Sequence, residues 1–167
     1  FITDMGFETY QKILAEAMEE LGVETGISSK GSSDNYVSDC TIETDQLALI
    51  PDSYIDVTAE KIRIYKELDS LSSEKEMEQM KKKLSDRFGT IPEELSRLFE
   101  IVRIRQLGQK LGFEKIIIKN GVMIAFFIYN SMSQYYRSNT FSRVLENISL
   151  NPKLFELKQN DNKLRIF

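Results

Sequence analysis

Two apolar runs joined by Asn120 and Gly121 constrain the fold of this chain more than any other feature. The runs read EKIIIK and VMIAFFIYN, and the dipeptide lies between them. Asn-Gly between apolar segments is typical of a two-residue β-hairpin, because both residues accept positive φ angles. Nearly continuous apolar residues predict the buried centre of a sheet, although an exposed part could form a face that binds a partner.

The remaining segments predict the fold class. A second hairpin is expected in KLFELKQNDNKLRIF, with its turn at 160–162. A short strand is expected at about 46–50, ended by Pro51. Helical spacing of apolar residues predicts helices at about 58–71, 74–88, 92–111 and 132–148. This order predicts an α+β fold, with helices packed on one face of a small, mostly antiparallel sheet built largely from two hairpins.

The N-terminal part has a different character. Residues 1–21 contain FETYQKILAEAMEEL, an amphipathic pattern that predicts a separate N-terminal helix closed by Gly22. Residues 22–44 are rich in glycine, serine and acids and predict a linker, so the α+β domain is expected at 45–167. The chain begins at Phe1 rather than methionine and stops inside a predicted strand, so we expect a fragment of a longer protein.

Composition excludes several classes of function. The net charge of −4 provides no overall basic field for nucleic acid. Cys40 is the single cysteine, so no disulfide can form within the chain, and a cytoplasmic location fits best. No apolar run approaches the roughly 20 residues that span a bilayer, so no membrane partner is expected.

Few residues suggest catalysis. The sequence has no histidine, the usual general base and commonest metal ligand, and no glycine-rich phosphate loop. Asp52, Asp56 and Glu60 could be imagined around a hard cation, but they fit turn and helix-capping acids better. An enzyme is therefore disfavoured, and we expect neither a metal nor a cofactor in this fragment.

A DNA-binding accessory domain is the alternative function. Arg97, Arg103 and Arg105 lie in one predicted helix, and Tyr135 and Tyr136 follow later in the sequence. Cations near aromatic rings can bind a nucleic acid strand by charge and stacking. We expect at most a weak DNA contact through the three arginines, because the chain is acidic overall.

The stretch LSDRFGTIPEEL predicts a corner between two helices. Phe88 ends one apolar stripe, Gly89 suits a helix C-terminus, and Pro92 suits the first turn of the next helix. We interpret these three residues as structural anchors that leave Asp86 and Arg87 on a rigid edge. Two readings stay open for that pair, which either binds a partner or only ties two helices together.

The order and spacing of these residues resemble the C-terminal regulatory (TRCF) domain of bacterial transcription-repair coupling factors. That family carries a leucine, then Asp-Arg-Phe-Gly, then a proline three residues on and a leucine-rich helix, as at Leu84, 86–89 and Pro92 here. Three further stretches are similar to the family: DMGFETYQKILAEAMEEL, IPDSYI and KIRIYKEL. The resemblance covers roughly 1–112. The first motif that carries it is partly shared with a related branch-migration helicase.

The resemblance implies a function for the parent protein. The family is a cytoplasmic ATP-driven DNA translocase that displaces stalled RNA polymerase and recruits the excision-repair protein UvrA. Its motor, which uses ATP and Mg²⁺ and contacts DNA, would lie upstream of this fragment, next to the hook-like helix at 1–21.

For this fragment the resemblance implies a non-catalytic domain that docks on the N-terminal domain of its own protein and masks the UvrA-binding surface. Carried over, the docking surface includes Asp86 and Arg87. Lys83 stands where relatives can carry an acid, so the local charge pattern of the dock is expected to differ here.

Overall fold

The computed structural model describes residues 36–160 and 163–167. The predicted helix at 7–21 and residues 22–35 of the predicted linker lie outside this range. The chain divides into two compact units, whose described parts are 46–102 in unit 1 and 36–45 with 103–167 in unit 2. The expected domain at 45–167 thus contains two such units, and residues 36–44 belong to the second.

Unit 1 is helical. It contains α2 (Thr58–Ser70), α3 (Glu74–Phe88) and the first part of α4 (Glu93–Leu111). Apolar side chains of all three helices meet in one core, whose fully buried members include Ile64, Tyr65, Leu68, Leu95, Leu98, Phe99 and Val102. Ser73 and Glu76 form a capping box at the start of α3, in which each side chain accepts a hydrogen bond from the other residue's backbone N–H group.

Hydrogen bonds join the loop before α2 to α2 and to α3, the two helices that follow it. The buried Tyr65 hydroxyl accepts a hydrogen bond from the Ile50 backbone N–H at 3.1 Å. The Tyr54 hydroxyl lies 3.1 Å from two carbonyl oxygens at the end of α3, those of Leu84 and Gly89. A hydroxyl has one hydrogen, so the two oxygens share it. Burial raises the pKa of Tyr54, which keeps this donor protonated.

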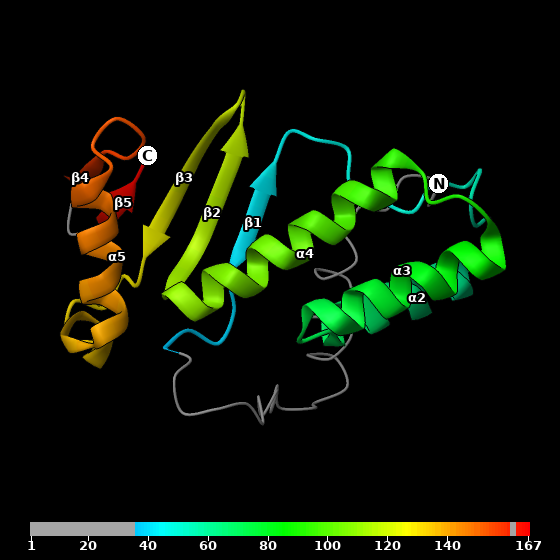
Figure 1. Cartoon of the computed structure of the whole chain (residues 1–167), viewed down its shortest axis with the longest axis horizontal. Coiled ribbons are helices and arrows are strands. Elements are labelled where there is room, and N and C mark those ends of the chain that lie inside the picture. The colour runs from blue at the N-terminus through cyan, green and yellow to red at the C-terminus, as the bar shows by residue number, and fades with distance from the viewer. Residues whose placement is uncertain (1–35, 161–162) are drawn as a thin grey trace, which may run out of the picture. The chain divides into compact units, whose positions relative to one another are not determined.

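Unit 2 contains a five-stranded sheet (Figure 1) in the order β1-β2-β3-β5-β4. The strands are β1 (Thr41–Thr44), β2 (Phe113–Lys119), β3 (Val122–Phe127), β4 (Leu157–Asn160) and β5 (Lys163–Ile166). All neighbouring pairs are antiparallel except β1 with β2. Asn120 and Gly121 have φ angles of 53° and 73°, which confirms the predicted hairpin turn.

The strand predicted at about 46–50 was wrong, because the first strand is β1, inside the predicted linker. Ile42 alternates with polar neighbours and is buried against the sheet, where it pairs in register with Ile116. Residues 46–50 instead form a loop that leads into the unit 1 core, where Ile50 is buried.

Helices of unit 2 cover one face of the sheet. A Cβ added at Gly108 of α4 would meet the Sγ of Cys40 at 2.6 Å and a methyl group of Ile116 at 3.0 Å, so the helix lies directly on β1 and β2. The helix predicted at 132–148 is a 3-10 turn (Gln134–Arg137) followed by α5 (Asn139–Leu150). An apolar cavity of about 510 Å³ lies between α5 and the sheet residues Met123, Ala125 and Ile166.

The α+β class and the mostly antiparallel sheet are confirmed. In the late part of α4, Leu107 and Leu111 are 49% and 40% exposed. No described helix is both long and apolar enough to cross a membrane.

The contact between Gly108 and Cys40 gives a stability prediction. Gly108→Ala should lower the free energy of unfolding by about 1–3 kcal/mol, because the new methyl group overlaps the Cys40 sulfur. In a Cys40→Ala background the sulfur is absent, so the same substitution should cost less, with a coupling energy of about 0.5–3 kcal/mol. Urea unfolding of the four proteins measures this coupling. If Gly108→Ala lowered the free energy of unfolding by the same amount in both backgrounds, the close contact between Gly108 and Cys40 would be contradicted.

The Tyr54 hydroxyl gives a second prediction. Tyr54→Phe should destabilise the chain by about 0.5–1.5 kcal/mol, the net contribution of one hydrogen bond, while the ring packing stays in place. The matched control is Tyr129→Phe, whose hydroxyl is on an exposed side chain and should matter little. Thermal unfolding compares the two variants, and equal stability of both would show that the bond to α3 contributes nothing.

Candidate docking site

The corner that ends α3 is built as the sequence predicts. Gly89 has a φ of 89°, a left-handed conformation that favours glycine, and its N–H donates to the Ser85 carbonyl oxygen at 3.0 Å. The Phe88 ring is half-buried against the unit 1 core, with its centroid 5.8 Å from that of Tyr54. The carbonyl oxygen of Pro92 accepts the first backbone hydrogen bond of α4, from the Ser96 N–H. The structure thus places Phe88, Gly89 and Pro92 where anchors of the turn are expected.

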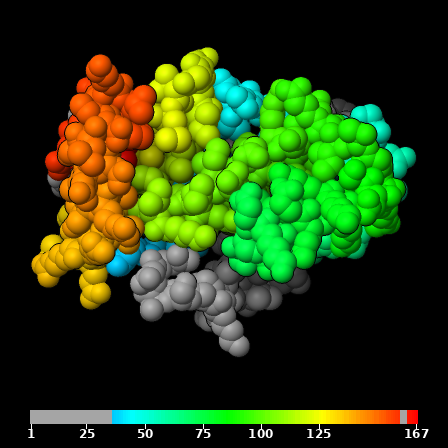
Figure 2. Space-filling model, in the orientation of Figure 1, coloured from blue at the N-terminus to red at the C-terminus, as the bar shows by residue number. Residues whose placement is uncertain are grey.

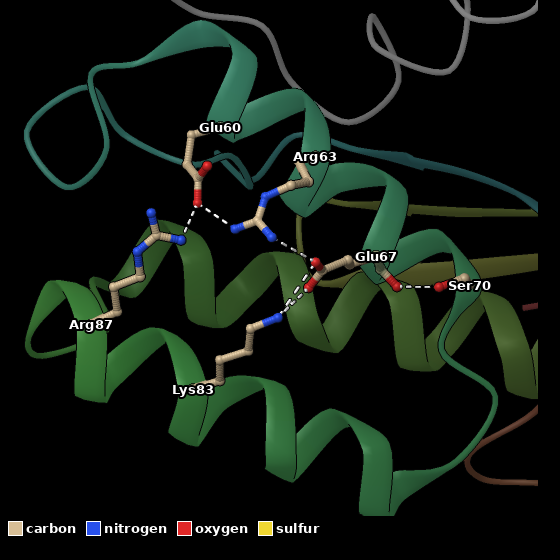
Figure 3. Close-up of polar contacts among 6 residues, drawn as sticks. All are labelled: Glu60, Arg63, Glu67, Ser70, Lys83 and Arg87. Atoms are coloured by element: carbon tan, nitrogen blue, oxygen red, sulfur yellow. Dashed lines mark hydrogen bonds and ion pairs between the residues drawn. The ribbon is translucent and has the colours of Figure 1, made fainter.

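A chain of ion pairs joins α2 to α3 beside this corner (Figure 3). Glu60 Oε1 lies 2.5 Å from Nη1 of Arg87 and 2.5 Å from Nη2 of Arg63. Arg63 continues to Glu67 at 3.2 Å, and Glu67 binds Nζ of Lys83 at 3.1 Å. The Ser70 hydroxyl donates to the Glu67 backbone carbonyl. Single pairs at such exposure contribute little stability, but the connected set fixes how the side chains lie.

Glu60 is the centre of this ion-pair chain. A hydrogen bond from Arg63, together with the charges of Arg63 and Arg87, lowers the pKa of the Glu60 carboxyl. Glu60 is ionised at neutral pH, as a glutamate ordinarily is, and its lowered pKa means that the ion pairs loosen only when the pH falls through that lowered value. Arg87 is therefore held toward α2, while its guanidinium also lies 4.8 Å from the centroid of the Phe88 ring.

The outer face of α3 forms a shallow hollow of about 450 Å³ next to the ion-pair chain. It is lined by residues at helical spacing, which puts them on one face: Gln79, Lys82, Lys83, Asp86 and Arg87. Asp86 is exposed and makes no ion pair with any residue in the described part of the chain. Figure 2 shows α3, in green, open on the side toward the viewer.

The three predicted docking residues thus lie together but are not equivalent. Arg87 and Lys83 are partly neutralised by acids of α2, with side chains 54% and 56% exposed. Asp86 is exposed and has no ion-pair partner among the described residues. The alternative reading, in which Asp86 and Arg87 tie two helices together, fits Arg87 alone, because its ion pair crosses to Glu60 of α2.

The arginines predicted to contact DNA are placed differently. Arg97 pairs with Glu93 one turn earlier in α4, and Arg105 binds Asp39 at 2.7 Å with a side chain only 15% exposed. Arg103 is exposed. Tyr135 is fully buried, and its hydroxyl donates to the Leu111 carbonyl at 2.6 Å, so its ring is not available for stacking. A DNA contact through these arginines stays a prediction.

Two of the acids considered for a hard cation are held in ion pairs. Asp52 forms an ion pair with Lys61, and Glu60 belongs to the ion-pair chain. Asp56 is exposed at the start of α2.

Sequence reasoning missed Glu67 and Tyr54 as residues that position the site. A signal for Glu67 was present, since Glu60, Arg63 and Glu67 recur at helical spacing in α2 and Lys83 and Arg87 recur in α3. No local signal marked the Tyr54 hydroxyl, whose acceptors lie 30 and 35 residues away.

Comparison with known proteins gives consistent results. The TRCF domain family matches residues 44–138. The transcription-repair-coupling factor of Rickettsia typhi is 34% identical over 133 residues, covering 79% of this chain and 11% of that protein. The Escherichia coli protein of the same name is 33% identical over 114 residues, covering 67% of this chain and 10% of that protein. That of Rickettsia prowazekii is 30% identical over 164 residues, covering 98% and 13% respectively.

A solved structure agrees at the level of fold. The crystal structure of the C-terminal domain of a transcription-repair coupling factor matches with a TM-score of 0.61 and 19% identity, covering 77% of each chain. The chain spans only 10–13% of the length of the three curated relatives named above. Because the matching family covers more than half of its 167 residues, the chain belongs to the TRCF domain family.

Proposed function

We propose that this chain is the non-catalytic regulatory domain of a transcription-repair coupling factor and docks on the N-terminal domain of its own protein. Docking masks the surface through which the parent recruits UvrA. The observation that carries the proposal is Asp86, an exposed carboxylate without an ion-pair partner in the described part of the chain, on a corner held by Tyr54 and Phe88.

The charge pattern suggests what the partner surface offers. Asp86 needs a cation, and a charge-assisted bond from an arginine of the partner would suit a carboxylate on a rigid edge. Lys82 and Lys83 on the same face would meet an acid or a carbonyl group. Because Arg87 is already paired with Glu60, its guanidinium offers the partner little unpaired charge. It would act mainly through its fixed position and through contacts of its aliphatic chain.

The parent's other properties follow from the same proposal. We propose that the parent is a cytoplasmic translocase whose motor uses ATP and Mg²⁺, contacts DNA and displaces RNA polymerase. This fragment binds neither ATP nor metal itself, which agrees with the absence of histidine and of a phosphate loop from its sequence.

The test removes the Asp86 carboxylate. In a titration of the 167-residue chain against the N-terminal domain, Asp86→Ala should weaken docking at least tenfold, because a partner cation would lose its counter-charge on burial. In the full-length parent, the same change should increase UvrA binding. Its effect on stability should stay within about 0.5 kcal/mol, as for most surface substitutions.

Glu146→Ala is the matched control, because it also removes one exposed carboxylate but lies on α5 in unit 2. It should leave both docking and UvrA binding unchanged. If Asp86→Ala docks as tightly as the control, the carboxylate is not part of the interface. If Asp86→Ala unfolds the chain while docking per folded molecule is unchanged, the residue is structural.

A further inference from the structure

The two faces of the unit 2 sheet differ. Ile116, Ala125 and Ile166 point to the face that α4 and α5 cover. Side chains alternate along a strand, so Lys115, Phe126 and Arg165 point to the other face. We call this second side the open sheet face; it also carries Lys119, Lys158 and Lys163 by the same alternation. The side chains of Lys115, Lys119 and Lys158 are 37%, 48% and 46% exposed.

Strand register lines up charged and aromatic side chains across this face. Lys115 is opposite Phe126, Phe126 is opposite Arg165, and Arg165 is opposite Lys158. These four residues form one row across four strands, at about 4.8 Å per step. The row therefore presents, in order across the sheet, a cation, an aromatic ring and two further cations.

Two cations of the open sheet face lie against aromatic rings. The Arg165 guanidinium is 5.6 Å from the Phe126 ring centroid, and Lys163 Nζ is 5.6 Å from that of Tyr129. Neither cation has a carboxylate partner in the described part of the chain, and Arg165 Nε is buried without an acceptor. The Tyr129 side chain is 60% exposed. Rings and unneutralised cations thus share one surface.

Acids on and beside this face neutralise only part of its charge. Glu43 pairs with Lys115 and Lys119, and Glu156 pairs with Lys158. Glu114 lines the rim of a hollow of about 360 Å³, whose other lining includes Lys115, Phe126, Tyr129 and Lys163. Among the described residues of this face, five cations and three acids leave a local excess of positive charge, in a chain whose net charge is −4.

We propose that the open sheet face binds single-stranded DNA. Bases would stack on the Tyr129 ring and on the Arg165 guanidinium above Phe126, and phosphates would pair with Lys163, Arg165 and Lys115. Stacking requires unpaired bases, so a duplex would gain only the phosphate contacts. A peptide of acidic residues could pair with the cations, but it has no aromatic base to stack on the Tyr129 ring. The rings and cations of this face would contact bases and phosphates rather than a 2′-hydroxyl.

The proposed surface is distinct from the α3 docking site and from the arginines of α4. About three phosphate contacts predict a shallow salt dependence, with log K falling by about 2 per tenfold rise in salt. Binding should therefore be weak and best measured at low salt.

The experiment uses fluorescence anisotropy of a labelled oligo-dT strand with the 167-residue chain at low salt. Tyr129→Ala should weaken binding about tenfold or more, whereas Tyr129→Phe, which keeps the ring, should bind like the wild type. Lys163→Ala should weaken binding and reduce the salt slope by about 0.7. Lys75→Ala, an exposed lysine of α3, is the matched control and should change neither.

Three competitors decide the ligand class. A duplex of equal length, an oligo-rU strand and a poly-glutamate peptide should each compete no better than unlabelled oligo-dT. Absence of oligo-dT binding, or a Tyr129→Ala variant that binds like wild type, would overturn the proposal. Tighter binding of the duplex, the RNA or the peptide would also overturn it, in favour of that ligand. Tyr129 and Lys163 are exposed, so their variants should fold normally, which circular dichroism would check.

Discussion

One hydroxyl group joins the loop before α2 to the far end of α3. The Tyr54 side chain reaches the carbonyl oxygens of Leu84 and Gly89, on either side of the helix end, and its ring packs beside Phe88. A donor that bonds carbonyls on both sides of the helix end helps to fix the direction in which the chain leaves the helix. The position of Asp86 relative to the unit 1 core depends on this closure.

Charge is divided between the two sides of α3. On the side toward α2, Arg87 and Lys83 are drawn into ion pairs with Glu60 and Glu67, which orders long side chains that would otherwise move freely in solvent. On the outer side, Asp86 has no such partner in the described part of the chain. The outer part of α3 thus combines two ordered basic side chains with one carboxylate that has no ion-pair partner in the described part of the chain. A surface of this kind loses little entropy on binding, which favours a specific dock over a non-specific contact.

Local signals predicted much of the fold. The capping box of Ser73, the Asn120-Gly121 turn and the positive φ of Gly89 all depend on residues close in sequence, and all three are present. The strand β1 was missed because it pairs in parallel with β2, more than 70 residues later, and a segment of four residues carries no pattern of its own. The ion pair of Arg87 with Glu60 was missed for the same reason, since periodicity predicts helix faces but not which faces meet. The exposed position of Asp86 at the end of α3 could be predicted from the sequence, whereas the atoms that hold this helix end could not.

The central claim is that the outer face of α3 is covered by another part of the parent protein. Hydrogen exchange of peptides that span residues 82–89 tests it most directly, in the full-length parent and in the 167-residue chain. We predict slower exchange in the parent, with this protection lost in the Asp86→Ala parent and kept in the Glu146→Ala parent. Equal exchange of these peptides in the parent and in the isolated chain would contradict the account.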